Sequence, residues 1–312
     1  MKKVNSAEIS VVLPVYKCTE TIKELSKKLV LVLSKISKDY EIIFVVDGCP
    51  ENPWSLINSL ADKNKKIKGI KLSKNFGQHH AITAGIDSAS GNWVVVMDCD
   101  MQEEPADIEI LYKKAMEGFD IVLCKRVYRK DSFFKKAGSK MFFLIFNYLT
   151  TNKAVSSIGN FGIYSKKVID CVKLLKEQNR AFWLLVNWVG FNKTTINTIR
   201  HKRKKGRSSY NLKKLINLAM SSIIAHSNKP LKFTIFIGLL LSFFSFVAAS
   251  WVLYQYFVNA YRVLGWTSLM ISINFLGGLI LGAIGMLGLY IEKIFDQVKN
   301  RPLYIIDKKI NL

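Results

Sequence analysis

Two long apolar stretches near the C-terminus constrain the fold more than any other feature of the chain. They run roughly from Phe233 to Val258 and from Trp266 to Ile291, and neither contains a charged residue. Each is long enough to cross the ~30 Å hydrocarbon core of a bilayer as a helix. A buried helical hairpin in a soluble core is the alternative, but the aromatic residues of both stretches favour membrane spans. We therefore expect two transmembrane helices.

Basic residues around these stretches predict their orientation. The connecting segment, around Asn259–Gly265, holds only Arg262, whereas the outer flanks are richer in cations. The flanking cations are Lys229, Lys232, Lys293, Lys299, Arg301, Lys308 and Lys309. Positive charge is concentrated on the cytoplasmic side of membrane proteins. Both ends of the hairpin, and the chain before it, are expected in the cytoplasm, at the inner (plasma) membrane if the source is bacterial.

The overall composition limits the kinds of partner. The 312 residues carry a formal net charge of +23, which favours an anionic membrane, phosphates or nucleic acid. A soluble nucleic-acid-binding protein would leave the spans unexplained, so we expect no nucleic-acid partner. The cysteines are scattered singly, at Cys18, Cys49, Cys99, Cys124 and Cys171. This spacing argues against a zinc site or a disulfide framework and favours a reducing cytosol.

Short β-branched runs alternate with helical patterns before the first span. The predicted strands are Ile9–Pro14, Glu41–Val46, Ile67–Leu72 and Trp93–Met97, and the predicted helices are Thr21–Ser37, Trp54–Lys63 and His80–Ala89. This rhythm is typical of an α/β fold with an open, mostly parallel sheet and helices on both faces. Ligands of such sheets bind at the carboxyl ends of the strands.

Carboxylates follow two of these strands. Asp98 and Asp100 come directly after an apolar strand, where they would repel each other unless neutralised. Mg²⁺ or Mn²⁺ prefers such oxygen ligands and can bridge the phosphates of a nucleotide sugar. Solvated loops also contain D-x-D triplets, so the metal site is one of two interpretations. Asp47 precedes Gly48 and is expected at the mouth of the crevice, or as a turn-capping residue.

An ordered set of motifs then becomes recognisable. In its first half the set comprises Val12-Leu13-Pro14-Val15-Tyr16, Asp47-Gly48, Asn75-Phe76-Gly77-Gln78, Asp98-Cys99-Asp100-Met101-Gln102 and Pro105. Its second half comprises Arg126, Asp131-Ser132-Phe133, Trp188-Val189-Gly190-Phe191, Arg200, Arg203, Gly206, Ser208, Tyr210, Ser227 and Pro230-Leu231. The set resembles family-two glycosyltransferases of GT-A fold, specifically polyprenyl-phosphate glycosyltransferases similar to dolichyl-phosphate mannose synthase and to bacterial undecaprenyl-phosphate glucosyltransferases.

The resemblance implies a role for each matching residue. Pro14, Tyr16 and Asp47 would hold the nucleoside, Asp98 would contact the donor near its ribose and diphosphate, and Asp100 and Gln102 would bind the metal. The residues implied around the donor and acceptor phosphates are Arg126, Arg200, Arg203 and Ser208. Guanidinium groups suit phosphate binding because they form paired hydrogen bonds. A solvated or nucleic-acid-binding patch is the alternative for the basic run from Arg200 to Arg207.

Two departures from the family pattern bear on specificity. Val46 stands where relatives commonly have the first of two acidic residues, so nucleobase recognition is expected to differ. Asn160-Phe161-Gly162 stands where relatives commonly have Asp-Phe-Arg, and we place Asn160 with Arg126 on the acceptor side. No role is assigned to Glu103 or Glu104. His79 and His80 are expected as helix-start or core residues.

The expected domain plan has four parts. They are a cytoplasmic GT-A glycosyltransferase domain (1–211), a juxtamembrane interfacial helix (212–230), a transmembrane hairpin (231–292) and a cytoplasmic basic tail (293–312). The segments 133–149 and 212–224 are expected either flat on the bilayer or packed on the soluble core.

The expected reaction is metal-dependent, inverting transfer of a sugar from a nucleotide sugar to an undecaprenyl or dolichyl phosphate. UDP-glucose is the expected donor, against UDP-GalNAc, UDP-GlcNAc or GDP-mannose, and a homo-oligomer is left open. One alternative is transfer to a hydroxyl of a lipid-linked glycan. Another is a non-catalytic membrane protein with a transferase-like domain.

Overall fold

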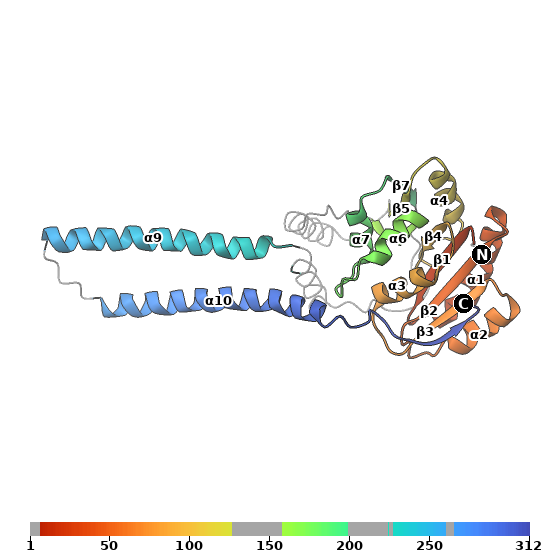
Figure 1. The fold of residues 1–312 in the computed structure, drawn as a ribbon, viewed down its shortest axis with the longest axis horizontal. Helices are drawn as coiled ribbons and strands as arrows, with labels where there is room; N and C mark the ends of the chain where they lie inside the picture. Colours follow the sequence, from red (N-terminus) through yellow and green to blue (C-terminus); the bar gives the residue numbers. More distant parts are fainter. Residues whose placement is uncertain (1–6, 127–157, 199–223, 225–226, 260–264) are drawn as a thin grey trace. The chain divides into compact units, whose positions relative to one another are not determined.

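The computed structural model describes residues 7–126, 158–198, 224, 227–259 and 265–312 (Figure 1). The chain divides into two compact units. The first consists of residues 1–144, 152–209 and 301–312, and the second of residues 145–151 and 210–300.

A mixed sheet forms the centre of the first unit. In the described part of the chain its strand order is β7-β5-β6-β4-β1-β2-β3-β8. The strands are β1 (Ile9–Val15), β2 (Tyr40–Val46), β3 (Ile67–Leu72), β4 (Trp93–Val96), β5 (Ile121–Arg126), β6 (Ile158–Ser165), β7 (Lys193–Thr198) and β8 (Ile306–Ile310). Strands β1 to β4 are mutually parallel, β6 runs antiparallel between β4 and β5, and β7 is parallel to β5.

Helices cover both faces of the sheet (Figure 1). The helices are α1 (Thr19–Ile36), α2 (Trp54–Lys63), α3 (Gln78–Ser88), α4 (Asp107–Met116), α6 (Lys166–Leu174) and α7 (Phe182–Val189). The buried residues of α1, α2 and α4 share one apolar cluster, and those of α3, α6 and α7 share another. The predicted α/β class is therefore confirmed.

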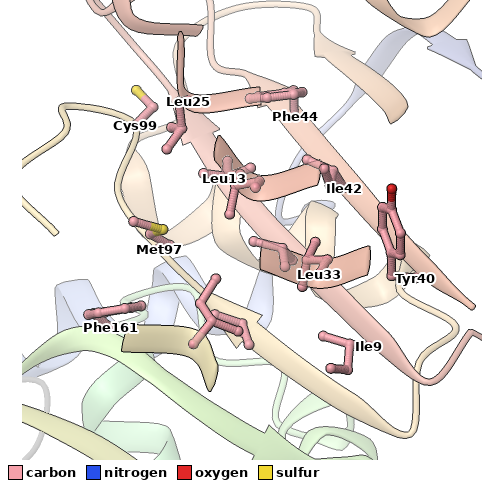
Figure 2. Close-up of a cluster of buried hydrophobic side chains, with 14 of the residues drawn as sticks. Ile9, Leu13, Leu25, Leu33, Tyr40, Ile42, Phe44, Met97, Cys99 and Phe161 are labelled. Carbon is pink, nitrogen blue, oxygen red and sulfur yellow. The ribbon is translucent and has the colours of Figure 1, made fainter. Parts of the chain in front are cut away.

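Strand β1 shows why the sheet is buried on both faces. Ile9 and Leu13 point into the cluster on the α1 side, whereas Val12 belongs to the cluster on the α3 side. In Figure 2, Leu13 lies among Leu25 of α1 and Phe44 of β2. Helix α1 buries Ile22, Leu25, Leu29 and Leu33, a helical spacing that places them on one face. Central parallel strands are apolar on both faces for this reason.

The segment 293–312, expected as a basic tail, is ordered. Its first residues complete a long helix that ends at Val298, and Ile306–Ile310 then forms β8, antiparallel to β3. The Ser73 amide donates to the Ile305 carbonyl at 2.9 Å, and Lys71 pairs with Asp307 at 2.9 Å. Strand β8 thus covers the exposed edge of β3, which would otherwise present unpaired backbone groups.

The described part of the second unit consists of two long apolar helices, α9 (Lys229–Asn259) and α10 (Trp266–Val298). The stretches Lys229–Ala248 and Ser272–Val298 are long and apolar enough to cross a membrane, and neither is buried. Helix α9 contains the first expected span, Phe233–Val258, and α10 contains the second, Trp266–Ile291, and both helices are longer than the spans. The expected interfacial segments lie outside the described residues, apart from Ile224.

Candidate active site

Three of the predicted motifs lie at the carboxyl ends of parallel strands, at one end of the sheet. Val15 of β1 is paired with Val46 of β2, and Val12 of β1 with Val96 of β4. The Asp47 amide donates to the Val15 carbonyl, and the Met97 amide to the Val12 carbonyl, each at 3.1 Å. The residues that follow β1, β2 and β4 therefore lie at the same end of the sheet, as expected for parallel strands.

The loop after β4 places its polar side chains on one side. Met97, Cys99 and Met101 are buried, and Figure 2 shows the first two in the core. Asp98, Asp100 and Gln102 alternate with them and are partly exposed. Met101 has a φ of 58°, a conformation that is rare for residues other than glycine and recurs at functional sites. The Asp100 Oδ1 accepts a hydrogen bond from the Gln102 amide at 3.2 Å.

This loop fits a hard divalent cation that takes few ligands from the protein. It presents carboxylate and amide oxygens on one side, which Mg²⁺ and Mn²⁺ prefer. Among the described residues, no cluster of three or more His, Cys, Asp or Glu side chains is arranged for a metal.

Two acidic residues to which the sequence assigned no role brace this loop. Glu103 is only 8% exposed, and its Oε2 accepts the Asp98 amide at 3.1 Å. Glu104 accepts a hydrogen bond from Lys28 of α1 at 3.3 Å. Only the fold brings Lys28 near the loop, so spacing along the chain could not have indicated its contact with Glu104.

Asp47 lies deeper than the sequence suggests. We expected its carboxylate either at the mouth of the crevice or capping a turn, and the residue is 2% exposed. Its Oδ1 accepts the Phe76 amide at 2.7 Å, and its Oδ2 accepts the Gly77 amide at 2.9 Å. Burial raises the pKa of Asp47, and these two hydrogen bonds offset part of the rise. Asp47 therefore holds the loop before α3, and its implied contact with the nucleoside stays a prediction.

The loop before α3 reaches the loop after β4 through one side chain. Gln78 begins α3, and its Nε2 donates to the Asp98 Oδ1 at 2.6 Å. The resemblance includes Gln78 but implies no role for it.

The end of β1 places its two predicted nucleoside contacts differently. Pro14 is buried within the strand, paired with Val45, whereas Tyr16 lies beyond the strand end and is 44% exposed. The next residue, Lys17, has a φ of 54°, and its amide donates to the Cys49 sulfur at 3.2 Å. Of the two, Tyr16 is the one open to a ligand.

The expectation from cysteine spacing that no disulfides form, and with it the inference of a reducing cytosol from the cysteines, fails for one pair. Cys18 at the start of α1 and Cys99 between Asp98 and Asp100 form a disulfide, with 6.3 Å between their Cα atoms. The Thr21 hydroxyl bonds to the carbonyl oxygens of Cys99 at 2.6 Å and Cys18 at 2.8 Å. The two residues are 81 positions apart, so the sequence gives no sign that they meet.

The acceptor-side residues are described in part. Val96 of β4 is paired with Gly162 of β6, and this antiparallel register puts Asn160 level with Asp98 just beyond the paired residues. The Asn160 Oδ1 is buried and has no hydrogen-bond partner in the described part of the chain. Arg126 ends β5, but its side chain is not among those described. Arg200, Arg203 and Ser208 also lie outside the described residues.

The two histidines of α3 take structural positions, as expected. His79 is partly buried, and its Nδ1 accepts the Phe182 amide at 3.2 Å. Burial is the main cause that lowers the pKa of His79 to about 4, and nearby His80 and Arg180 add to it. Burial also lowers the pKa of His80. Both imidazoles are therefore neutral near pH 7.

Comparison with known proteins agrees with the motifs. Residues 10–173 match the family described as "Glycosyl transferase family 2". The "Uncharacterized glycosyltransferase YkcC" of Bacillus subtilis is 36% identical over 306 residues, which cover 98% of this chain and 95% of the relative. The "SfII prophage-derived bactoprenol glucosyl transferase" of Shigella flexneri is 36% identical over 302 residues, which cover 96% of this chain and 98% of the relative.

A solved structure has a partial likeness. It is the glucosyl-3-phosphoglycerate synthase of Mycobacterium tuberculosis, in complex with Mn²⁺, uridine diphosphate and phosphoglyceric acid. It is 16% identical, covers 70% of this chain and 77% of its own, and has a TM-score of 0.47.

Proposed function

This chain belongs to glycosyl transferase family 2, and on that premise we propose that it transfers a hexose from a nucleotide sugar to a polyprenyl phosphate at a membrane. The carrying observation is the length of the likeness to a bactoprenol glucosyl transferase, which covers 96% of this chain. A match of that length takes in the strand-end site and most of the apolar hairpin. The expected hydroxyl-transferring and non-catalytic alternatives have no comparable support.

The donor is held where β1, β2 and β4 end. Tyr16 is exposed there and is available to the nucleoside, and UDP-glucose is the proposed donor. Asp100 and Gln102 present the oxygen ligands for Mg²⁺ or Mn²⁺, and Asp98 contacts the donor near its ribose and diphosphate. When bound, such a cation neutralises charge that develops on the departing diphosphate. Glu103 fixes the loop from behind by accepting the Asp98 amide.

The acceptor chemistry suits a phosphate better than an alcohol. A phosphate oxygen of the lipid attacks the anomeric carbon, the bond from that carbon to the nucleoside diphosphate breaks, and the configuration inverts. A phosphate monoester has a second pKa of about 6, so it is already largely ionised at neutral pH. An alcohol would need a positioned base. Asn160, level with Asp98, has no carboxylate to serve as one.

The two apolar helices would anchor the transferase domain to the membrane that holds the lipid acceptor. Residues 301–312 belong to the same compact unit as the N-terminal part of the chain. If α9 and α10 span a bilayer, the chain must therefore leave and re-enter that unit on one side. The basic flanks assign that side to the cytoplasm.

The test is transfer by the purified full-length protein in lipid vesicles. Radiolabelled UDP-glucose, UDP-GalNAc, UDP-GlcNAc and GDP-mannose are each supplied with a short-chain polyprenyl phosphate, and lipid-soluble label is counted. We expect UDP-glucose to give a product that mild acid hydrolyses, as a sugar phosphodiester does. An acid-stable glycoside would indicate a hydroxyl acceptor, and no release of nucleoside diphosphate from any donor would exclude a transferase.

A further inference from the structure

We infer that Gln78 is a positioning residue for Asp98, and that Asp47 holds Gln78 in place through the loop between them. The inference rests on the proposed function and deepens it, because it assigns the Asn75–Gln78 motif a task in donor binding. It also gives Asp47 a task other than the nucleoside contact implied by resemblance.

The loop before α3 is attached to the residue that follows β2. Both carboxylate oxygens of Asp47 accept backbone amides, from Phe76 at 2.7 Å and from Gly77 at 2.9 Å. In the other direction, the Asn75 Nδ2 donates to the Asp47 carbonyl at 3.1 Å. Three hydrogen bonds therefore join Asp47 to three consecutive residues, and a buried carboxylate held this way keeps a single orientation.

The backbone of this loop also packs closely against Gly48. Gly48 follows Asp47 with a φ of 54°, and a Cβ there would lie 2.2 Å from the Asn75 backbone nitrogen. No other residue fits that position without moving the loop. Gly77 has a φ of 97° and immediately precedes α3. The backbone from Asn75 to Gln78 is thus fixed by shape as well as by hydrogen bonds.

The helix that carries Gln78 is held by the core. Ala81, Ile82, Ala84 and Ile86 of α3 are buried in the cluster that also contains Val12 of β1 and Val45 of β2. Gln78 is the first residue of this helix, so its Cα is held by the core on one side and by the Asp47 loop on the other.

Gln78 contacts Asp98 directly. The Gln78 Nε2 donates to the Asp98 Oδ1 at 2.6 Å, while the Asp98 amide donates to Glu103 at 3.1 Å. Side chain and backbone of Asp98 are therefore held from two sides. A neutral amide orients the carboxylate without cancelling the negative charge that attracts a cation, which a lysine at this position would do.

If Gln78 served only the fold, replacing its side chain would change little. Its side chain is exposed and makes no part of the core. Removing its amide should therefore leave folding nearly unchanged, and any loss should be confined to ligands that depend on Asp98.

The experiment measures binding of UDP, with and without Mn²⁺, to the full-length protein in detergent or nanodiscs. Gln78→Met keeps the length and helix propensity of the side chain but removes its donor. Gln178→Met is the matched control, because the Gln178 side chain donates at the same 2.6 Å to the Arg301 carbonyl and not to Asp98. We expect Gln78→Met to weaken Mn²⁺-dependent UDP binding by about tenfold, as for a hydrogen bond to a charged group, with thermal unfolding unchanged.

Two further variants separate the inference from its rivals. In an Asp98→Asn background, Gln78→Met should have no further effect, because the carboxylate it positions is gone. Asp47→Asn should also weaken the Mn²⁺-dependent part of binding, and combining it with Gln78→Met should add little. Loss of metal-independent UDP binding in Asp47→Asn would instead make Asp47 a nucleoside contact and overturn its assignment here.

The outcomes distinguish this inference from the proposed function. If the wild type binds UDP with Mn²⁺ and Gln78→Met binds equally well, the positioning role is wrong and the proposed function stands. If Gln178→Met loses as much binding as Gln78→Met, the effect is structural and the inference is again wrong. If the wild type binds no nucleotide at all, the proposed function fails as well.

Discussion

The Tyr304 hydroxyl donates a hydrogen bond to the Asp87 carboxylate, with 2.8 Å between the two oxygen atoms, and so joins the segment after α10 to α3. Asn311 adds two contacts near the chain end, donating to the carbonyls of Ala61 and Ile67 at 2.9 Å. The last residues of the chain are therefore part of the first compact unit, although more than 200 residues separate them from their partners.

This relationship predicts that a cut near Pro230 does more than remove the hairpin. The truncated chain also loses β8, so we expect it to unfold at a lower temperature than a chain in which 301–312 is rejoined to 1–230 by a flexible linker. Tyr304→Phe in the full chain should cost about 1 kcal/mol, as for one hydrogen bond. Thermal unfolding and UDP binding of both chains provide the check. Equal stability with and without 301–312 would show that β8 is dispensable.

His79 predicts a loss of stability in mild acid. Its pKa is about 4 in the folded protein, against 6.5 for an unperturbed histidine. Between these values the unfolded chain binds more protons than the folded one, so stability falls as the pH drops from 6.5 towards 4 and levels off below. His79→Gln should flatten this dependence by no more than about 3 kcal/mol. Urea unfolding at pH 7.5 and pH 5 measures it, and an identical pH dependence in the variant would contradict the assignment.

The Cys18–Cys99 disulfide predicts a defined peptide map. Under non-reducing conditions, digestion of protein purified without reductant should give a peptide pair linked through Cys18 and Cys99, with Cys49, Cys124 and Cys171 alkylated. Loss of such a cross-link typically costs about 2–4 kcal/mol, so Cys18→Ser should lower the unfolding temperature while Cys171→Ser should not. Quantitative alkylation of Cys18 and Cys99 before reduction would show that the pair is not joined.

The basic run from Arg200 predicts unequal contributions of neighbouring cations. These residues lie outside the described part of the chain, so this prediction rests on resemblance. Arg200→Ala and Arg203→Ala should each reduce transfer far more than Lys204→Ala, because paired guanidinium contacts to phosphate are costly to lose. Lys204 would supply screened attraction to anionic lipid of about 1 kcal/mol. Turnover and vesicle binding at two salt concentrations separate the two effects. Equal losses in all three variants, in proportion to vesicle binding, would make the run a membrane-adhesion patch.

Local patterns predicted the four parallel strands β1 to β4 and the helices α1 to α3, whereas β5 to β8, α4, α6 and α7 were not predicted. Trp54–Lys63 and Ile67–Leu72 have the expected bounds. The apolar residues of the helix recur at a helical spacing, whereas the strand was indicated by a short apolar run whose buried residues do not strictly alternate. Strand β8 was missed because three of its five residues, Asp307, Lys308 and Lys309, are charged and its pairing with β3 is remote in sequence. An edge strand can be this polar because one side faces water.

The places of the candidate site residues in the fold could be predicted in part, their contacts could not, and their roles stay predictions. Asp98 and Asp100 could be placed because they follow a strand end. The Asp47–Phe76 hydrogen bond, the Gln78–Asp98 hydrogen bond and the Cys18–Cys99 disulfide all join residues at least 20 positions apart. Such pairings depend on how the strand-end loops converge, which a linear pattern does not specify.

The most direct test of the account compares wild type with Asp100→Asn in transfer from UDP-glucose to polyprenyl phosphate. Both proteins are assayed in the same vesicles over a titration of Mn²⁺ and again with EDTA. We expect the wild type to form the acid-labile lipid-linked sugar only when the cation is present. Asp100→Asn should be folded and inserted but lose at least about 100-fold in turnover, because a charged metal ligand is gone. Near-normal turnover of the variant at limiting Mn²⁺, or full wild-type activity in EDTA, would contradict the account.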